Sequence, residues 1–493
     1  PLPAIHLIIM ESTHHQDPPK DWKGIARQLG PGLIISANIV GSGELIVTTK
    51  VGADVGFILL WFIILGCMIK VFLQVELGRY AITHGRTTLQ AMDAVPGPRF
   101  SFIWKYLNLR AEASWLVWCW MIMFVATFFQ VSGMVGGIAG VFETGIPSLS
   151  QPPAWYAEGH VLDAGVGLPE ETLAHQWQQL LNKAWALCIT GSCALLLLMG
   201  RYRFIERFST GMVAAFTLFT IFAVFALYRT EYGITPSQLA TGLQFKLPEN
   251  FITAFAAFGV IGVGAAELIY YPYWCLEKGY ARFVGPREDS PEWEARAQGW
   301  MRVLKWDAWV SMVIYTGATV AFYLLGAAVL NGKGLEVTNN DLIPTLSNLY
   351  QESFGSLGLW LFLVGALVVL YSTVFISTAS NARLSADLWM LFTPSVSGSA
   401  RDRNALVRRA CILIPLLYFI FYVSVGQPLT LVFIGALAQA LMLPFLCFAA
   451  LYFHYAQTHR ALFPGKIWVL LLWISSLLMT SVGFYQLYDK LFP

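Results

Sequence analysis

Residues 40–46 of the chain read V-G-S-G-E-L-I, and residues 263–269 read V-G-A-A-E-L-I. The two heptapeptides lie 223 residues apart and are identical at five of seven positions. Each falls in a long apolar run and places one acidic residue, Glu44 or Glu267, beside small residues. Self-similarity of this kind is typical of a duplicated structural unit. The pair therefore predicts a chain built from two related halves.

The composition of the surrounding sequence predicts a membrane protein. Of the 493 residues, 57% are hydrophobic and only 12% are charged, which is about half the charged share of soluble domains. The mean hydropathy is +0.60. These values exclude water-soluble globular and disordered proteins. The formal net charge of +2, with no basic block interleaved with aromatic residues, also argues against nucleic acid as a partner and leaves membrane lipid.

Eleven apolar runs are long enough to cross a bilayer, which requires about 20 residues. They cover residues 31–54, 56–80, 114–142, 183–200, 209–229, 251–276, 306–331, 356–382, 405–425, 428–455 and 466–488. The two heptapeptides fall in the first and sixth runs, so the two halves face opposite sides of the membrane. We therefore expect an all-α membrane protein with an inverted repeat of 5+5 helices plus one helix.

The expected organisation is a short N-terminal segment followed by one transmembrane domain. The boundaries are 1–29 for the segment, 30–493 for the domain, about 30–230 and about 251–455 for the two repeats, and about 466–488 for the extra helix. Lys and Arg collect on the cytoplasmic side of membrane proteins. With the N-terminus inside, the inner segments hold 24 basic residues and the outer segments 6. This predicts a cytoplasmic N-terminus, and the lack of a targeting signal makes a bacterial inner membrane the default location.

The repeated glutamates also mark the expected substrate site. Glycines near Glu44 and Glu267, and Pro272 after the second, favour unwinding of the first and sixth helices near mid-membrane. Unwound segments expose carbonyl oxygens that coordinate ions. We therefore expect carbonyls around Gly41 and Val263 to act with the two carboxylates. The alternative is that the glycines permit close helix packing and the carboxylates are protonated or bonded to the broken backbone.

Several stretches resemble the Nramp divalent-metal transporters. The first is G-P-G-L-I-I-S-A-N-I-V-G-S-G-E from Gly30, followed by G-F-I-L-L-W at 56–61 and L-Q-V-E-L-G-R-Y at 73–80. Further similarity appears in F-G-V-I-G at 258–262, L-F-L-V-G at 361–365 and M-L-P-F at 442–445. The resemblance extends over nearly all eleven helices. It implies a LeuT-type fold with the first and sixth helices broken, and secondary transport of a divalent metal without a cofactor.

The residues at the family's metal-binding positions differ in this chain. The positions of the helix-1 motif D-P-G-N and of the helix-6 Ala and Met ligands correspond here to Gly41, Ser42, Gly43, Glu44, Val263 and Ala266, the last followed by Glu267. Gln439 stands three residues from the position of a metal-site Gln in the family. Because the thioether is absent and carboxylates are present, the resemblance implies a harder cation such as Mg²⁺ or Mn²⁺, with Glu44 and Glu267 as metal ligands.

Other functions stay open. Without the family's metal-binding Asp, a pocket lined by Tyr270, Tyr271 and Tyr371 would accept a small organic or other ionic solute. A non-transporting membrane binding protein is a further alternative. We do not expect an enzyme, because the sequence lacks H-E-x-x-H, G-x-S-x-G and a Gly-rich P-loop. Whether the protein is a monomer or a homo-oligomer does not follow from the sequence.

The coupling ion is equally open. The family's proton path in helix 3, A-T-D-x-x-E, corresponds to A-T-F-F-Q-V at 126–131, which holds no carboxylate and argues against proton coupling. Ser372, Thr373 and Ser377 in the eighth helix form a candidate Na⁺ site together with carbonyls of the first helix. The alternative is that these hydroxyls bond back to carbonyls of their own helix.

Charged residues of the second helix are candidates for a gate. Lys70 lies about two-thirds of the way along this run, and we interpret it as a side chain that extends to the membrane interface. A counter-charge for a carboxylate in the pathway is the alternative. Glu76 and Arg79 are three residues apart at the cytoplasmic end of this helix and are expected to form an interfacial ion pair, with an inner-gate role as the alternative.

Overall fold

The computed structural model of the chain describes residues 15–104, 109–149, 151–158, 170–199, 202–248, 255, 257–339, 341–393 and 400–491. Among these residues, nine helices are long and apolar enough to cross a membrane. The other two expected spans, 209–229 and 251–276, also contain helix, but the first has a short apolar part and the second is broken. The chain is an integral, multi-pass membrane protein.

The first repeat and its loops contain most of the short elements. They are α2 (Trp22–Gln28), α3 (Pro31–Ile39), a π-helix (Val40–Thr48), α4 (Thr49–Val55), α5 (Leu60–His84), α6 (Thr88–Asp93), β1 (Arg99–Trp104), β2 (Leu109–Ser114), α7 (Trp115–Gly145), a 3₁₀ turn (Pro147–Leu149), α8 (Ala154–Glu158), α9 (Glu170–Met199), α10 (Tyr202–Ala226), a 3₁₀ turn (Leu227–Arg229) and α11 (Pro236–Gly242). The two strands pair antiparallel, with Arg99 opposite Ser114.

The second repeat contains the longest helices. Its elements and those of the extra helix are α13 (Ala265–Lys278), α14 (Tyr280–Val284), α15 (Pro291–Leu325), a π-helix (Gly326–Leu330), α16 (Asn331–Lys333), α17 (Leu342–Phe354), α18 (Ser356–Phe392), α19 (Ala400–Val425), α20 (Pro428–Tyr452), a π-helix (Phe453–Gln457), a 3₁₀ turn (Arg460–Leu462) and α21 (Lys466–Leu491).

Helix 6, residues 255–278, is broken in its middle. A helical stretch ends at Phe258, the chain continues without helix through Gly264, and α13 then begins. Gly262 in this gap has a φ of +62°, a left-handed conformation that residues with a Cβ rarely adopt. Pro272 lies inside α13 and does not interrupt it. The break therefore comes from the glycine-rich segment, and the proline makes no second interruption.

Helix 1, residues 31–55, is not unwound as expected. It runs from α3 to α4 through a π-helix at Val40–Thr48. A π-turn displaces carbonyls from their usual i+4 partners. Side chains satisfy two of them, because Thr48 Oγ1 donates to Gly43 O at 2.9 Å and Thr49 Oγ1 donates to Glu44 O at 3.2 Å. Helix 1 thus has a widened helical segment where helix 6 has a gap.

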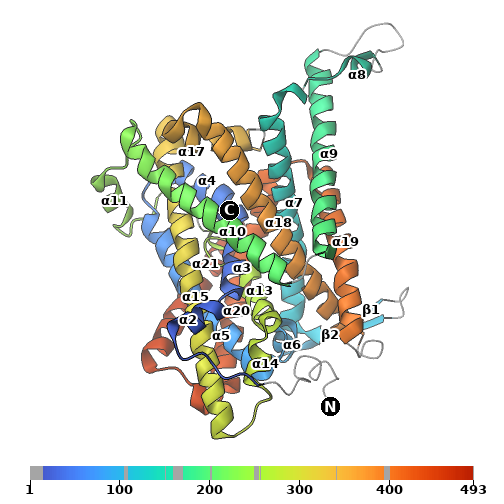
Figure 1. Cartoon of the computed structure of the whole chain (residues 1–493), viewed down its shortest axis with the longest axis vertical. Coiled ribbons are helices and arrows are strands. Elements are labelled where there is room, and N and C mark those ends of the chain that lie inside the picture. The colour runs from blue at the N-terminus through green and yellow to red at the C-terminus, as the bar shows by residue number, and fades with distance from the viewer. Residues whose placement is uncertain are drawn as a thin grey trace.

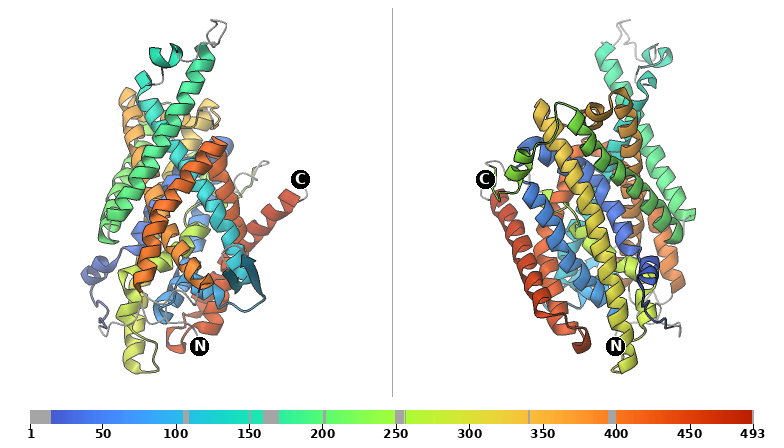
Figure 2. Two further views of the ribbon diagram at one scale, coloured as in Figure 1. Left: turned by 90° about the vertical axis from the view of Figure 1, so that its right-hand side faces the viewer. Right: turned by 60° about the vertical axis from the view of Figure 1, so that its left-hand side comes forward.

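The helices form one bundle around helices 1 and 6. Figure 1 shows α3 and α13 inside the bundle, with α10 crossing in front of them and α9 rising beyond the other helices. The long α15 runs the height of the bundle, and α21 lies along its outside (Figure 2). Residues of helices 1 and 6 are almost all buried. The broken helix and its partner are therefore shielded from lipid by the surrounding helices.

Candidate functional site

The centre of the candidate site is the carboxyl group of Glu267 in the first turn of α13. Its Oε1 accepts a hydrogen bond from Asn38 Nδ2 of α3 at 2.6 Å. Asn38 Oδ1 in turn accepts one from Ser377 Oγ of α18 at 2.7 Å. Glu267 is 6% exposed, and the other two residues are buried. Because a helix N-terminus carries partial positive charge, this position stabilises an acidic side chain inside the bundle.

Gln439 of α20 joins this group through the backbone of α13. Its Oε1 accepts a hydrogen bond from the Ala266 N–H at 2.9 Å, and its Nε2 donates to Gln130 Oε1 of α7 at 2.7 Å. Gln439 therefore reaches the start of α13 and also links two helices, so both roles considered from the sequence are present. Val263 lies in the gap of helix 6, three residues before Ala266.

Glu44, the second repeated glutamate, bonds to the gap in helix 6. Its Oε1 accepts a hydrogen bond from the Gly262 N–H at 3.1 Å, and its Oε2 accepts one from Thr48 Oγ1 at 2.7 Å. The side chain is 0% exposed. Each glutamate therefore contacts the opposite repeat, since Glu44 bonds to helix 6 and Glu267 bonds to helix 1. The side chain of Ser42, the neighbouring candidate, lies outside the described part of the chain.

Three glycines allow these helices to approach one another. A Cβ on Gly41 would lie 2.0 Å from Thr373 Oγ1, and one on Gly43 would lie 2.7 Å from Val260 O. At Gly264 a Cβ would lie 2.4 Å from Gln439 Oε1. Separations below 3.0 Å require atoms to move. The packing role weighed for Gly41 from the sequence is therefore correct, and it brings helix 1 against both α18 and the gap.

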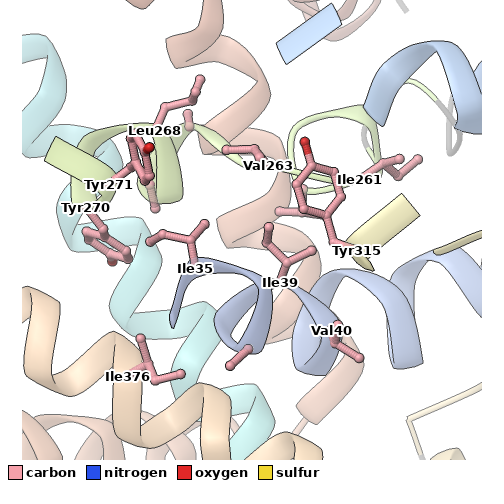
Figure 3. Close-up of a cluster of buried hydrophobic side chains, with 14 of the residues drawn as sticks. Ile35, Ile39, Val40, Ile261, Val263, Leu268, Tyr270, Tyr271, Tyr315 and Ile376 are labelled. Atoms are coloured by element: carbon pink, nitrogen blue, oxygen red, sulfur yellow. The ribbon is translucent and has the colours of Figure 1, made fainter. Parts of the chain in front are cut away.

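Apolar side chains fill the space between helix 1 and helix 6 beside the polar group. Figure 3 shows Ile35 and Ile39 of helix 1 pointing toward Val263 and Ile261 of the gap, with Tyr315 beside Ile261. All five are buried. A buried polar group in apolar surroundings is stabilised only when its hydrogen bonds are satisfied. The site is therefore closed, and a solute can reach it only after helices move.

Asp307 of α15 holds the start of helix 1, a contact that the sequence did not predict. Its Oδ1 accepts a hydrogen bond from Gly30 N at 2.8 Å, and its Oδ2 accepts one from Gly32 N at 2.7 Å. Tyr271 of α13 donates its hydroxyl to Oδ2 at 3.0 Å. Tyr280 reinforces the contact by donating to Gln28 O at 2.7 Å. Tyr271 is therefore part of this closure and not of a solute pocket.

Tyr371 lies away from the candidate site. Its hydroxyl bonds to Ser192 Oγ of α9 at 2.9 Å, beside an apolar cavity of ≈ 440 Å³ between α7, α9 and α18. Tyr270 instead donates to Asn381 Oδ1 at 2.6 Å, and Tyr271 bonds to Asp307. The three tyrosines therefore do not line a common pocket, and the sequence-based prediction of one was wrong.

The hydroxyls of the candidate Na⁺ site face helix 1. Thr373 Oγ1 donates to Asn38 O at 3.1 Å and lies 3.3 Å from Ala37 O, and Ser372 Oγ lies 3.4 Å from Ala37 O. Both also bond back to Val369 O of their own helix. The back-bonding alternative is therefore confirmed at Ser372 and Thr373, and the Na⁺ site stays a prediction. Ser377 instead supports the amide of Asn38.

The three gate candidates of α5 occupy two separate places. Lys70 is 0% exposed and donates its ammonium to Phe258 O at 2.5 Å and to Ile261 O at 2.6 Å. It does not reach the interface, because the gap in helix 6 offers unpaired carbonyls close to it. Glu76 and Arg79 form the predicted ion pair at 3.0 Å, but the pair is buried against Trp468 of α21. The expected pairing is therefore confirmed, and the inner-gate alternative stays a prediction.

Among the residues described, no group of three or more His, Cys, Asp or Glu side chains is arranged to hold a metal. Any cation at this site would therefore be bound largely by amide, hydroxyl and carbonyl oxygens around one or two carboxylates. Asn38 and Asp307 are the residues that sequence reasoning missed. Their signal was present, since each is a polar residue inside an apolar run, but their partners lie more than 200 residues away.

Residues 172–489, more than half of the chain, match the model of the Nramp family, described as natural resistance-associated macrophage protein-like. The chain belongs to the Nramp family. A search of curated protein sequences finds no match. The family membership, taken with the bundle, agrees with the resemblance seen in the sequence.

Solved structures similar to this Nramp chain include a mutant of the manganese transporter of Eremococcus coleocola, with a TM-score of 0.64 and 16% identity over 98% of this chain and 91% of that one. The same transporter in complex with an aromatic bis-isothiourea substituted compound gives 0.62 and 15% over 99% and 91%. Mhp1, a nucleobase-cation-symport-1 family transporter, gives 0.52 and 13% over 94% of both chains. The fold is of the LeuT type, with an inverted repeat of five helices.

Proposed function

We propose that this Nramp chain moves a divalent cation across the membrane by alternating access, with Mg²⁺ or Mn²⁺ preferred. The observation that carries the proposal is the buried group of Glu267, Asn38 and Ser377 at the junction of helices 1, 6 and 8. A cation between Glu267 and Asn38 would replace the amide hydrogens that now face the carboxylate. The Asn38 amide would turn to present its oxygen.

The donor set supports a hard cation. The side chains gathered at the start of α13 offer carboxyl, amide and hydroxyl oxygens from Glu267, Asn38, Ser377 and Gln439. Oxygen ligands suit Mg²⁺ and Mn²⁺, whereas a thioether would favour softer metals. Family membership implies a metal ion as substrate, and the similar Eremococcus protein is described as a manganese transporter. These points favour a transported metal over an organic solute and a transporter over an enzyme.

The direction and setting of transport are part of the proposal. We place the N-terminus on the cytoplasmic side of a bacterial inner membrane, because 24 of the basic residues fall on that side and 6 on the other. In this orientation, Asp307 closes the inner side of the site and the start of helix 1 must leave it for inward release. Coupling to protons is not proposed, because residues 126–131 contain no carboxylate.

Coupling to Na⁺ is the second candidate, and one contact favours it. The Thr373 hydroxyl lies within hydrogen-bonding distance of two successive carbonyls of helix 1, Ala37 O and Asn38 O. Hydroxyl and carbonyl oxygens are suitable ligands for a hard monovalent cation. A flux that rises with Na⁺ in wild type and loses this dependence in Thr373→Val would support the candidate. Flux that is equal in Na⁺ and choline would eliminate it.

Binding and flux of divalent cations test the main proposal. We would measure Mg²⁺, Mn²⁺ and Ca²⁺ by calorimetry on purified protein and by uptake into proteoliposomes, for wild type, Glu267→Gln and Glu44→Gln. Loss of one contact to a charged group costs about 1.5–3 kcal/mol, so affinity should fall about 10- to 100-fold in Glu267→Gln.

Glu112→Gln is the matched control, because it makes the same change on an exposed strand residue. Its affinity and flux should equal those of wild type. If wild type binds no divalent cation, or if both site variants bind as wild type does, the proposal fails. Binding without flux would instead identify a non-transporting binding protein.

A further inference from the structure

The gap in helix 6 already contains a cation that belongs to the protein. The ammonium group of Lys70 donates to Phe258 O at 2.5 Å and to Ile261 O at 2.6 Å. It also lies 4.6 Å from the centre of the Phe258 ring. The side chain is 0% exposed and enters the gap from α5. These contacts place one positive charge at the broken end of the first half of helix 6.

The surroundings of the ammonium are those of an ion site. The last carbonyls of a helix have no intrahelical partner and carry partial negative charge. In transporters with broken helices, such carbonyls coordinate the transported or coupling ions. Lys70 supplies the cation itself, and an aromatic face adds a further favourable contact. A buried ammonium group is unfavourable unless its N–H donors are satisfied. The Lys70 side chain is long enough to reach these carbonyls from its position on α5, and they satisfy its donors.

We propose that Lys70 is a tethered cation that fills a monovalent-cation site in the gap of helix 6. The site would take an ion of the ammonium or K⁺ class if the side chain were shortened. Lys70 also interacts electrostatically with Glu44 and Glu267. When both glutamates are ionised, as metal binding requires, the two carboxylates and the one ammonium would give the region a net charge of −1 before any substrate enters. The fixed positive charge of Lys70 therefore limits the affinity of the site for a divalent cation. This second part of the proposal rests on the proposed function.

Shortening the side chain tests the tethered cation directly. Lys70→Ala and Lys70→Ser would be purified in ammonium, methylammonium, K⁺, Na⁺ and choline chlorides at equal ionic strength, and their unfolding temperatures compared. A ligand that binds only the folded state raises this temperature in a concentration-dependent way. We expect ammonium or K⁺ to raise it saturably in both variants. Wild type, Lys70→Met and the surface control Lys50→Ala should show no such difference between salts.

The possible results separate this proposal from the proposed function. Equal unfolding temperatures of both shortened variants in all five salts would overturn the tethered cation, and so would failure of both to fold with ammonium or K⁺ present. Saturable stabilisation by these ions would support it even if wild type bound no divalent metal. If wild type does bind divalent metal, Lys70→Met should bind it at least about tenfold more tightly, because a fixed like charge is removed. Unchanged or weaker binding would overturn the charge-setting role.

Discussion

Replacing Asp307 with alanine should open the side of the site that carries the N-terminus. The carboxyl group of Asp307 accepts hydrogen bonds from Gly30 N, Gly32 N and the Tyr271 hydroxyl, at 2.8, 2.7 and 3.0 Å. Alanine leaves all three donors buried without this acceptor while the site stays closed. When the start of helix 1 moves away, water can satisfy them. The substitution therefore destabilises the closed state more than the open one.

The size of the effect follows from the bonds that are lost. A hydrogen bond to a charged acceptor contributes about 1.5–3 kcal/mol, so the two backbone donors alone represent about 3–6 kcal/mol. At the lower limit, the ratio of open to closed molecules rises about 10²-fold. Tyr271→Phe removes a single donor to the same carboxylate, worth about 1.5 kcal/mol at the lower limit, and should raise the ratio about tenfold. The two variants thus form a graded series.

Cys275 reports the opening without an added probe. It is buried on α13, one turn after Tyr271, and should react with a membrane-impermeant maleimide only when this side is open. The rate of labelling of Asp307→Ala, measured by mass spectrometry of the Cys275 peptide, should exceed that of wild type by about the same 10². Cys275→Ser in each background gives the labelling of the other six cysteines.

An aspartate at the far end of helix 1 provides the control for this series. Asp54 pairs with Lys50 at the other end of the helix, where both side chains are partly exposed, so Asp54→Ala should leave the Cys275 labelling rate unchanged. If Asp307→Ala and wild type are labelled at equal rates, Asp307 does not hold the site closed. Equal acceleration by Asp54→Ala would show that loss of any acidic side chain opens the bundle, and would also refute the reasoning.

Two further substitutions test the packing and the limits of the site. Gly41→Ala places a Cβ 2.0 Å from Thr373 Oγ1 and should cost about 1–3 kcal/mol of stability, seen as a lower unfolding temperature; a wild-type temperature would mean that helix 1 and α18 can separate freely. Tyr371→Phe loses the hydrogen bond to Ser192 and should cost about 1 kcal/mol of stability, while the affinity for divalent cations stays the same. A marked drop in this affinity would show that Tyr371 belongs to the substrate site.

The sequence predicted the features that depend on pattern and spacing. The inverted repeat followed from two heptapeptides, and the helices lie close to the apolar runs. Glu267 was selected because a charged side chain inside a span is rare, and Gln439 because it stands three residues from the family's metal-site Gln; the two meet at the start of α13. The cost of a charged group in the membrane does not depend on knowing its partner, so the sequence could select Glu267, and the role of both residues in binding stays a prediction.

The predictions that were wrong depended on how a helix is rotated about its own axis, which decides the neighbour that each side chain faces. Neighbouring residues of an α-helix point about 100° apart, so Tyr371 faces α9 while Ser372 and Thr373 face helix 1. A sequence does not give that rotation. The prediction for Lys70 was wrong for a related reason. Its position along α5 suggested that the side chain extends to the membrane interface, whereas the gap of helix 6 beside it supplies carbonyls that bind the ammonium group.

Helix 1 is attached to α13 at the candidate site and to α15 at its own start. These two attachments link the candidate site to the contact that closes it. Asn38 bonds to Glu267 at the site, and Asp307 joins the start of helix 1 to Tyr271. Glu267 and Tyr271 are four residues apart and project from the same face of α13. In the proposed function, a cation bound by Glu267 competes with the Asn38 amide and removes the first attachment. Inward release then requires the contacts at the start of helix 1, among them those of Asp307 and Tyr280, to open, so substitutions at Asp307 should change flux without changing the ligands of the ion.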